Sequence, residues 1–116
     1  MTYLEAIAQA EAVLPLFENL FPGDSRVRVC IEVSRVYAER RQSRESLVEA
    51  KALATRAARM AFDREERLLV RDNPDWRLAA AASWAALAGR NCANEEGYGA
   101  ERCANLARIA KEKTNA

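Results

Sequence analysis

Histidine is absent from the 116-residue sequence, and this absence removes several kinds of chemistry at once. It excludes histidine general bases, Ser-His-Asp and Cys-His nucleophiles, and zinc sites with histidine ligands. No apolar run approaches the roughly 18 residues that a membrane-spanning helix needs. The N-terminal segment carries Glu5 and Glu11, whereas a signal peptide would begin with basic residues. The sequence therefore predicts a cytoplasmic protein with no membrane partner.

Cysteine is scarce, and Cys30, Cys92 and Cys103 are too far apart to form a Cys-x-x-Cys pair. Such pairs are typical of zinc and thioredoxin-like sites, so we predict no metal site and no cofactor. Cys30 lies in an apolar stretch and is expected to be a small core residue. The sequence also lacks the P-loop, dinucleotide-binding, metalloprotease, hydrolase and calcium-loop motifs. We therefore predict no catalytic residues and no enzymatic activity.

Glycine and proline are rare, at four and three residues, whereas alanine, the best helix former, supplies 24. A chain of this length can bury one hydrophobic core but not two. We therefore predict that residues 1–116 form a single all-α domain, a compact bundle of about five helices. We expect its alanine-rich core to be tightly filled, with little room for a substrate pocket.

The first half of the chain predicts two helices, one over residues 2–19 with Thr2 as its N-cap. Pro15 is expected to kink or break this helix, because proline removes one backbone hydrogen bond. Alternating Val and Ile residues in the second helix, residues 26–40, would also suit a strand. A lone strand would leave its backbone groups unpaired, so the helix is favoured. Its broad apolar stripe predicts that it is the central, heavily buried helix.

The second half predicts three more helices. A long one begins at Ser43 as N-cap, runs to about residue 70 and buries a face of small residues. The next follows Asn73 as N-cap and covers residues 74–90. Its two tryptophans, Trp76 and Trp84, are expected to pack in the core or between helices. A loop then leads to the last helix, residues 100–111.

The charge is unevenly distributed along the chain. Residues 1–22 hold three acidic and no basic residues, whereas residues 23–72 hold twelve basic and nine acidic residues. A DNA-binding domain usually has a larger basic excess, because its affinity rises with each phosphate that it neutralises. Nucleic acid is therefore a possible partner but not the favoured one.

Three segments carry a resemblance to a known family: residues 13–18 (VLPLFE), residues 21–28 (FPGDSRVR), and Ile31 and Glu32 with Arg35. They resemble immunity proteins of bacterial polymorphic toxin systems, in particular the all-helical, alanine-rich family numbered fifth among them. Members have an apolar first helix, a Pro/Asp turn, an Asp-x-Arg-x-Arg helix start and alanine-rich later helices. The resemblance implies a small inhibitor that binds a toxin or nuclease and covers its active site.

Charged residues at three places are the candidate partner-binding residues. The first helix offers acids that would face the basic groove of a nuclease, and the second helix begins with an Asp/Arg pair. Three arginines share one side of the third helix; they would face an acidic partner or a nucleic-acid backbone, or form a solvated face with intrahelical pairs. These candidates are Glu5, Glu11, Glu18, Asp24, Arg26, Arg64, Arg67 and Arg71.

Two alternatives stay open. A phage-encoded inhibitor of a CRISPR effector would also be small, helical and steric in its mechanism, so its partner would be a Cas effector. A helical regulator that binds nucleic acid is the second alternative, with residues 42–43 as the turn of a helix-turn-helix motif.

Overall fold

A computed structural model describes residues 2–40 and 43–114, and every regular element in these two ranges is helical. The elements are α1 (Tyr3–Glu18), α2 (Arg26–Ala38), α3 (Arg44–Val70), α4 (Trp76–Asn91), the short 3-10 helix η1 (Glu95–Gly97) and α5 (Ala100–Thr114). The prediction of an all-α bundle is confirmed. None of the described helices is long and apolar enough to span a membrane.

Two of the three N-caps that the sequence indicated are present, those of α1 and α3. The side chains of Thr2 and Ser43 accept hydrogen bonds from the backbone N–H three residues further on, at 3.2 and 3.4 Å. The prediction that Asn73 is the N-cap of the fourth helix is wrong: α4 begins at Trp76, and Asp75 is its N-cap without a side-chain hydrogen bond. Asn73 Oδ1 instead accepts a hydrogen bond from the backbone N–H of Asp75 at 2.9 Å, in the turn before α4. These contacts satisfy backbone N–H groups that have no partner inside a helix.

Of the kink or break predicted at Pro15, the break is absent, because α1 continues through this residue to Glu18. Pro15 itself is exposed, so its ring does not disturb the core. Val13, Leu14 and Phe17 on either side of it are buried and hold the helix against its neighbours. Packing of this apolar face therefore outweighs the loss of a single backbone hydrogen bond.

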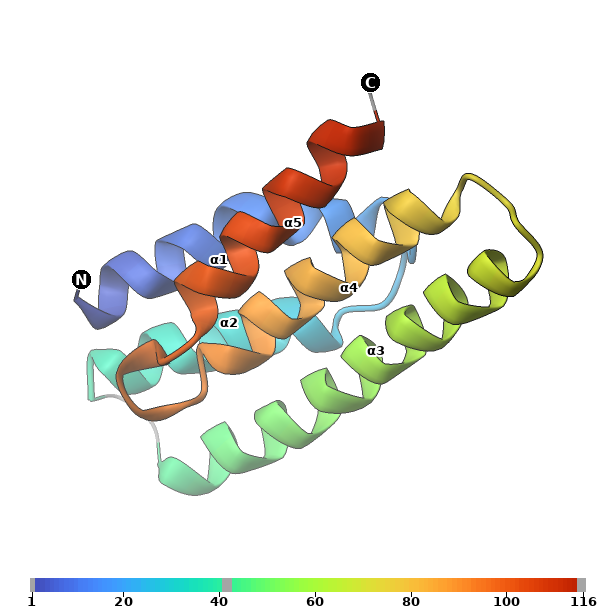
Figure 1. The fold of residues 1–116 in the computed structure, drawn as a ribbon. Helices are drawn as coiled ribbons and strands as arrows, with labels where there is room; N and C mark the ends of the chain where they lie inside the picture. The colour runs from blue at the N-terminus through green and yellow to red at the C-terminus, as the bar shows by residue number, and fades with distance from the viewer. Residues whose placement is uncertain (1, 41–42, 115–116) are drawn as a thin grey trace.

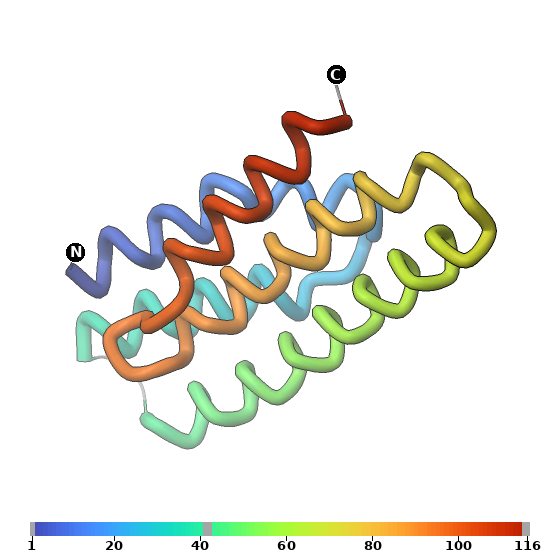
Figure 2. The backbone as a smooth tube through the Cα atoms, viewed as in Figure 1, coloured from blue at the N-terminus to red at the C-terminus, as the bar shows by residue number. Residues whose placement is uncertain are grey.

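The helices pack in two layers around α4. Figure 1 shows α3, α4 and α5 side by side, with α1 and α2 behind them, and α4 contacts each of the other four helices. Figure 2 shows that α1, α3 and α5 run in one direction and that α2 and α4 run in the other. The bundle measures 46 × 25 × 20 Å.

The central helix is α4, and the prediction that α2 takes this place is wrong. Ten of the 16 residues of α4 are buried, mostly alanines, whereas α2 buries four of its 13 residues. Val29 on α2 is 39% exposed, and Val33 and Val36 are half-buried. A helix of small residues lets neighbours approach on every side, so α4 accommodates four partners and α2 does not.

Candidate functional site

Two of the three candidate acids on α1 form ion pairs with arginines of α2. Arg35 Nη2 lies 2.8 Å from Glu11 Oε2, and Arg28 Nε donates to Glu18 Oε2 at 2.8 Å. Glu11 and Glu18 are seven residues apart and therefore share the side of α1 that borders α2. Glu5 points away from that side, is exposed, and has no ion pair within the described residues. The three acids thus do not form one continuous surface.

At the start of α2, the side chains of Asp24 and Arg26 form an ion pair with each other. Asp24 Oδ1 accepts a hydrogen bond from the backbone N–H of Arg26 at 3.1 Å, and Arg26 Nη2 lies 2.7 Å from Asp24 Oδ2. Hydrogen bonds from the Arg26 side chain hold the pKa of Asp24 below its usual value. Arg26 Nη2 also contacts Met60 Sδ on α3 at 3.6 Å. The pair therefore begins α2 and ties it to α3.

The three candidate arginines lie at the C-terminal end of α3, with Arg64 and Arg67 in the helix and Arg71 as its C-cap. All are exposed, and in the described part of the chain none forms an ion pair with a carboxylate. The guanidinium of Arg64 lies 5.2 Å from the ring centroid of Phe21, and Arg67 Nε donates to the backbone carbonyl of Asp63 at 3.3 Å. Arg71 follows the last residue of α3. This stripe offers positive charge to solvent.

The cysteines are buried and not activated. Burial raises the pKa of Cys30 to about 11 and that of Cys92 to about 12, and it also raises the pKa of Cys103. A thiol with a raised pKa stays protonated and is a poor nucleophile and metal ligand. The expectation that Cys30 is a core residue is confirmed. Across residues 2–40 and 43–114, no three Cys, Asp or Glu side chains are grouped so that they could hold a metal ion.

An apolar feature that the sequence did not indicate lies between α4 and α5. Tyr98, in the loop after η1, is 84% exposed. Together with Trp84, Arg102 and Leu106 it borders a surface hollow of about 530 Å³. Trp84 packs against the core, as predicted. The side chain is only half-buried, however, and also borders this hollow.

A further exposed aromatic residue lies on the flank of α3 that borders α4. Thr55 Oγ1 accepts a hydrogen bond from Arg90 Nε at 3.1 Å, so the flank of α3 that carries Thr55 borders α4. Phe62 lies two helical turns further along this flank and is 48% exposed. We use the term apolar band for Phe62, Trp84, Tyr98 and Leu106. The one local sign of it in the sequence is Tyr98, an aromatic residue between two glycines in a predicted loop.

Four exposed acids lie at one end of the bundle, near Tyr98. A Cβ on Gly97 would lie 3.0 Å from Ala6 Cβ, so η1 packs directly on the start of α1. Arg108 Nη2 donates to Gln9 Oε1 at 2.7 Å, which aligns α5 with α1 and brings the first turns of both helices to this end. The acidic end, as we define it, consists of Glu5, Glu95, Glu96 and Glu101. None of these four has an ion-pair partner in the part of the chain that is described.

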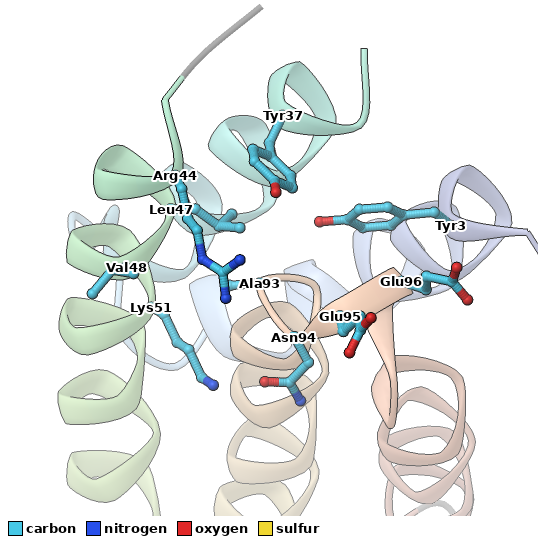
Figure 3. A pocket seen from close by; sticks show the side chains of 10 residues that line it. All are labelled: Tyr3, Tyr37, Arg44, Leu47, Val48, Lys51, Ala93, Asn94, Glu95 and Glu96. Atoms are coloured by element: carbon cyan, nitrogen blue, oxygen red, sulfur yellow. The ribbon is translucent and has the colours of Figure 1, made fainter. Parts of the chain in front are cut away.

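The expectation that the protein leaves little room for a pocket is wrong at its surface. A second hollow, of about 510 Å³, opens where the start of α3 stands apart from η1 (Figure 3). The core is filled largely by small side chains, as predicted, and the hollow lies at the surface of the bundle.

The arrangement of α2 and α3 bears on the nucleic-acid alternative. The two helices lie side by side and run in opposite directions (Figure 1). A helix-turn-helix motif instead crosses its helices at about 90–120°. Of the proposed turn, residue 42 lies outside the described residues.

No protein-family model, curated protein or solved structure matches the chain. The resemblance to the immunity-protein family therefore stays a prediction.

Proposed function

We propose that this protein is a small non-enzymatic inhibitor, like an immunity protein, that binds a toxin or nuclease effector and sterically blocks it. The apolar band is the observation that carries this proposal. Tyr, Trp and Arg dominate the binding energy of protein interfaces, and such residues anchor in pockets of the partner. Tyr98 and Trp84 lie beside Arg102 around one hollow, and Tyr98 is 84% exposed. Burial of Tyr98 by a partner would remove most of its apolar surface from water.

The charge beside the band supports a basic partner. Glu5, Glu95, Glu96 and Glu101 lie at the same end as Tyr98, so an approaching protein meets negative charge next to an apolar anchor. A nuclease must present a basic groove to bind the phosphate backbone of its substrate. Complementary charge would steer the inhibitor to that groove and speed association. Bound there, the protein would exclude the nucleic acid from the active site.

The same argument supports a Cas effector as the second candidate target, because such effectors hold nucleic acid in a positively charged channel. A nucleic-acid ligand is less favoured, because the acidic end would repel phosphates. The arginine stripe on α3 lies on a different helix flank and would be the place for such a ligand.

The test is to capture the partner from the native host with the tagged protein and to measure inhibition of the captured protein's toxic or nuclease activity. Tyr98→Ala is expected to weaken the complex about 30-fold, the cost of removing a typical interface anchor. Val29→Ala is the matched control, because Val29 is a partly exposed apolar residue on α2, outside the apolar band. It should leave the affinity unchanged.

Charge reversal tests the acidic end separately. Glu5→Lys/Glu101→Lys should slow association and reduce its dependence on salt, with little effect on dissociation. Equal inhibition by wild type and Tyr98→Ala would contradict the proposal. So would the capture of partners that are neither toxins, nucleases nor other effectors.

A further inference from the structure

The hollow of about 510 Å³ at the end of the bundle has a lining unlike that of the apolar band (Figure 3). Its lining residues come from α1, α2, the first turns of α3, the turn after α4, and η1. Its size lies within the range of about 300–1,000 Å³ that is typical of small-molecule sites. Charged groups of both signs border it, the positive ones on α3 and the negative ones on η1.

The wall formed by α3 is positively charged. Arg44 and Lys51 are seven residues apart and therefore lie on the same side of α3. Figure 3 shows both head groups directed toward the hollow. Among the described residues neither has a carboxylate partner, and Lys51 is half-buried. Charges on a concave, low-dielectric wall produce a stronger local potential than the same charges on a flat surface.

Two tyrosines from α1 and α2 form the adjoining wall. Tyr3 Oη donates to the carbonyl oxygen of Cys92 at 2.8 Å, and burial raises the pKa of Tyr3 to about 12. This phenol therefore stays neutral and adds no negative charge beside the cations. The hydroxyl of Tyr37 points toward Tyr3 in Figure 3 and has no hydrogen-bond partner within the described ranges. It is available to donate a hydrogen bond to a ligand.

The wall on the other side of the hollow is acidic. Glu95 and Glu96 of η1 lie across from Lys51 in Figure 3. Their negative charge would repel a simple anion to some extent but would attract a positive group on the same ligand. The arrangement therefore favours a molecule with opposite charges at its two ends.

We propose that this hollow binds a small zwitterion, an amine that also carries a phosphate or carboxylate group. The oxyanion would lie between Arg44 and Lys51 and accept a hydrogen bond from the Tyr37 hydroxyl, while the ammonium group would face Glu95. Neither cation and neither tyrosine belongs to the apolar band, but Glu95 and Glu96 also belong to the acidic end. Tyr98→Ala, which leaves all of the hollow's residues in place, is therefore the variant that separates this site from the proposed inhibitor function.

Titration calorimetry with three probes tests the proposal: O-phosphoethanolamine, β-alanine and ethyl phosphate. The first two are zwitterions with a phosphate and a carboxylate group, and they identify which oxyanion is preferred. Ethyl phosphate lacks the ammonium group. We expect the better zwitterion to bind with a Kd of about 1 mM or lower and at least about threefold more tightly than ethyl phosphate.

Variants connect the binding to the hollow. Arg44→Gln/Lys51→Gln should weaken the better zwitterion at least about tenfold, because it removes two charge-assisted contacts. Arg56→Gln/Arg59→Gln is the matched control, since it removes the same net charge from the exposed face of α3 and should have no effect. Tyr37→Phe removes one hydroxyl without loss of charge and should weaken binding severalfold. Circular dichroism checks that each variant is folded.

Three results would overturn the proposal: no heat of binding from either zwitterion at about 10 mM, equal weakening by the control pair, or equal affinity for ethyl phosphate. The Tyr98→Ala variant should bind the zwitterion as the wild type does, so failure of the inhibitor function and failure of this site are distinguishable.

Discussion

Gly89 sets the distance between the central helix and α2. Alanine at this position would favour the helix by about 1 kcal/mol. Its Cβ, however, would lie 2.4 Å from Val27 Cγ1 and 3.3 Å from Ile31 Cδ1, and both of these side chains are buried. We therefore expect Gly89→Ala to lower the free energy of unfolding by about 1–3 kcal/mol, as overpacked cores do. Urea unfolding followed by circular dichroism measures the change.

A double-mutant cycle provides the control for this prediction. Val27→Ala removes the atom that the new Cβ of Ala at position 89 would meet. The loss of unfolding free energy caused by Val27→Ala should therefore be smaller in the Gly89→Ala background than in the wild type. Additive effects of the two substitutions would show that α2 moves away freely, and the argument from close packing would then be wrong.

At the scale of single residues, the sequence indicated local contacts and missed distant ones. The Asp24 contact with the N–H of Arg26 spans two residues, and such capping follows from residue type. Glu11 and Arg35 are 24 residues apart, and the spacing of acids along one helix contains no information about that partner. The sequence therefore predicted an acidic surface on α1, but it did not indicate that Arg35 and Arg28 on α2 form ion pairs with two of its acids, Glu11 and Glu18.

Pro15 leads to a prediction about helix α1. Pro15 is exposed within a continuous helix, and it prevents one backbone hydrogen bond. Pro15→Ala should therefore raise the free energy of unfolding by about 1–2 kcal/mol, somewhat less than the intrinsic helix preference, because alanine also makes the unfolded chain more flexible. Thermal unfolding should show a midpoint several degrees higher. A lower midpoint would mean that the proline ring packs in a way that its exposure does not suggest.

At the scale of helices, the starts of α1 and α3 were predictable, whereas the identity of the central helix was not. Thr2 and Ser43 cap their helices through contacts within one turn, so the local sequence specifies them. The width of an apolar stripe indicates how much of a helix prefers burial, but it does not indicate how many neighbours fit around it. Alanines have little hydrophobic surface each, so α4 resembled an ordinary helix in sequence although it contacts all the others.

The whole bundle should lose stability at alkaline pH. Tyr3, Cys30 and Cys92 lie where α1, α2 and α4 meet, and burial raises the pKa of each, to about 12, 11 and 12. Each group keeps its proton in the folded state and loses it more readily in the unfolded chain. Stability from these groups is complete below pH 9, near the usual pKa of a thiol, and is lost as the pH rises through the folded values.

Thermal unfolding at pH 8, 9, 10 and 11 measures this loss, and the midpoint should fall with increasing steepness above pH 9. Cys30→Ala/Cys92→Ala should be less stable at neutral pH, because it removes buried atoms, but its midpoint should depend less on pH. The same dependence in wild type and variant would exclude the thiols as the cause.

At the scale of the molecule, the apolar band could not be predicted because its four residues come from α3, α4, a loop and α5. In the sequence, nothing about these residues distinguishes them from other helix or loop residues. Only the packing of the helices brings Trp84, Tyr98 and Leu106 around one hollow, with Phe62 on the flank of α3 that borders α4. The all-α fold, by contrast, follows from composition and periodicity, which act along every segment independently.

The shared direction of α1 and α5 has a practical consequence for labelling. Tyr3 packs against η1, so a tag fused before Thr2 would project beside the hollow and the acidic end. Thr114 lies 15 residues along α5 from that end, about 20 Å away at the rise of an α-helix. A fluorophore or an immobilisation tag attached at the C-terminal end of α5 would therefore leave the hollow and the acidic end accessible. The same group attached at the N-terminus would obstruct both.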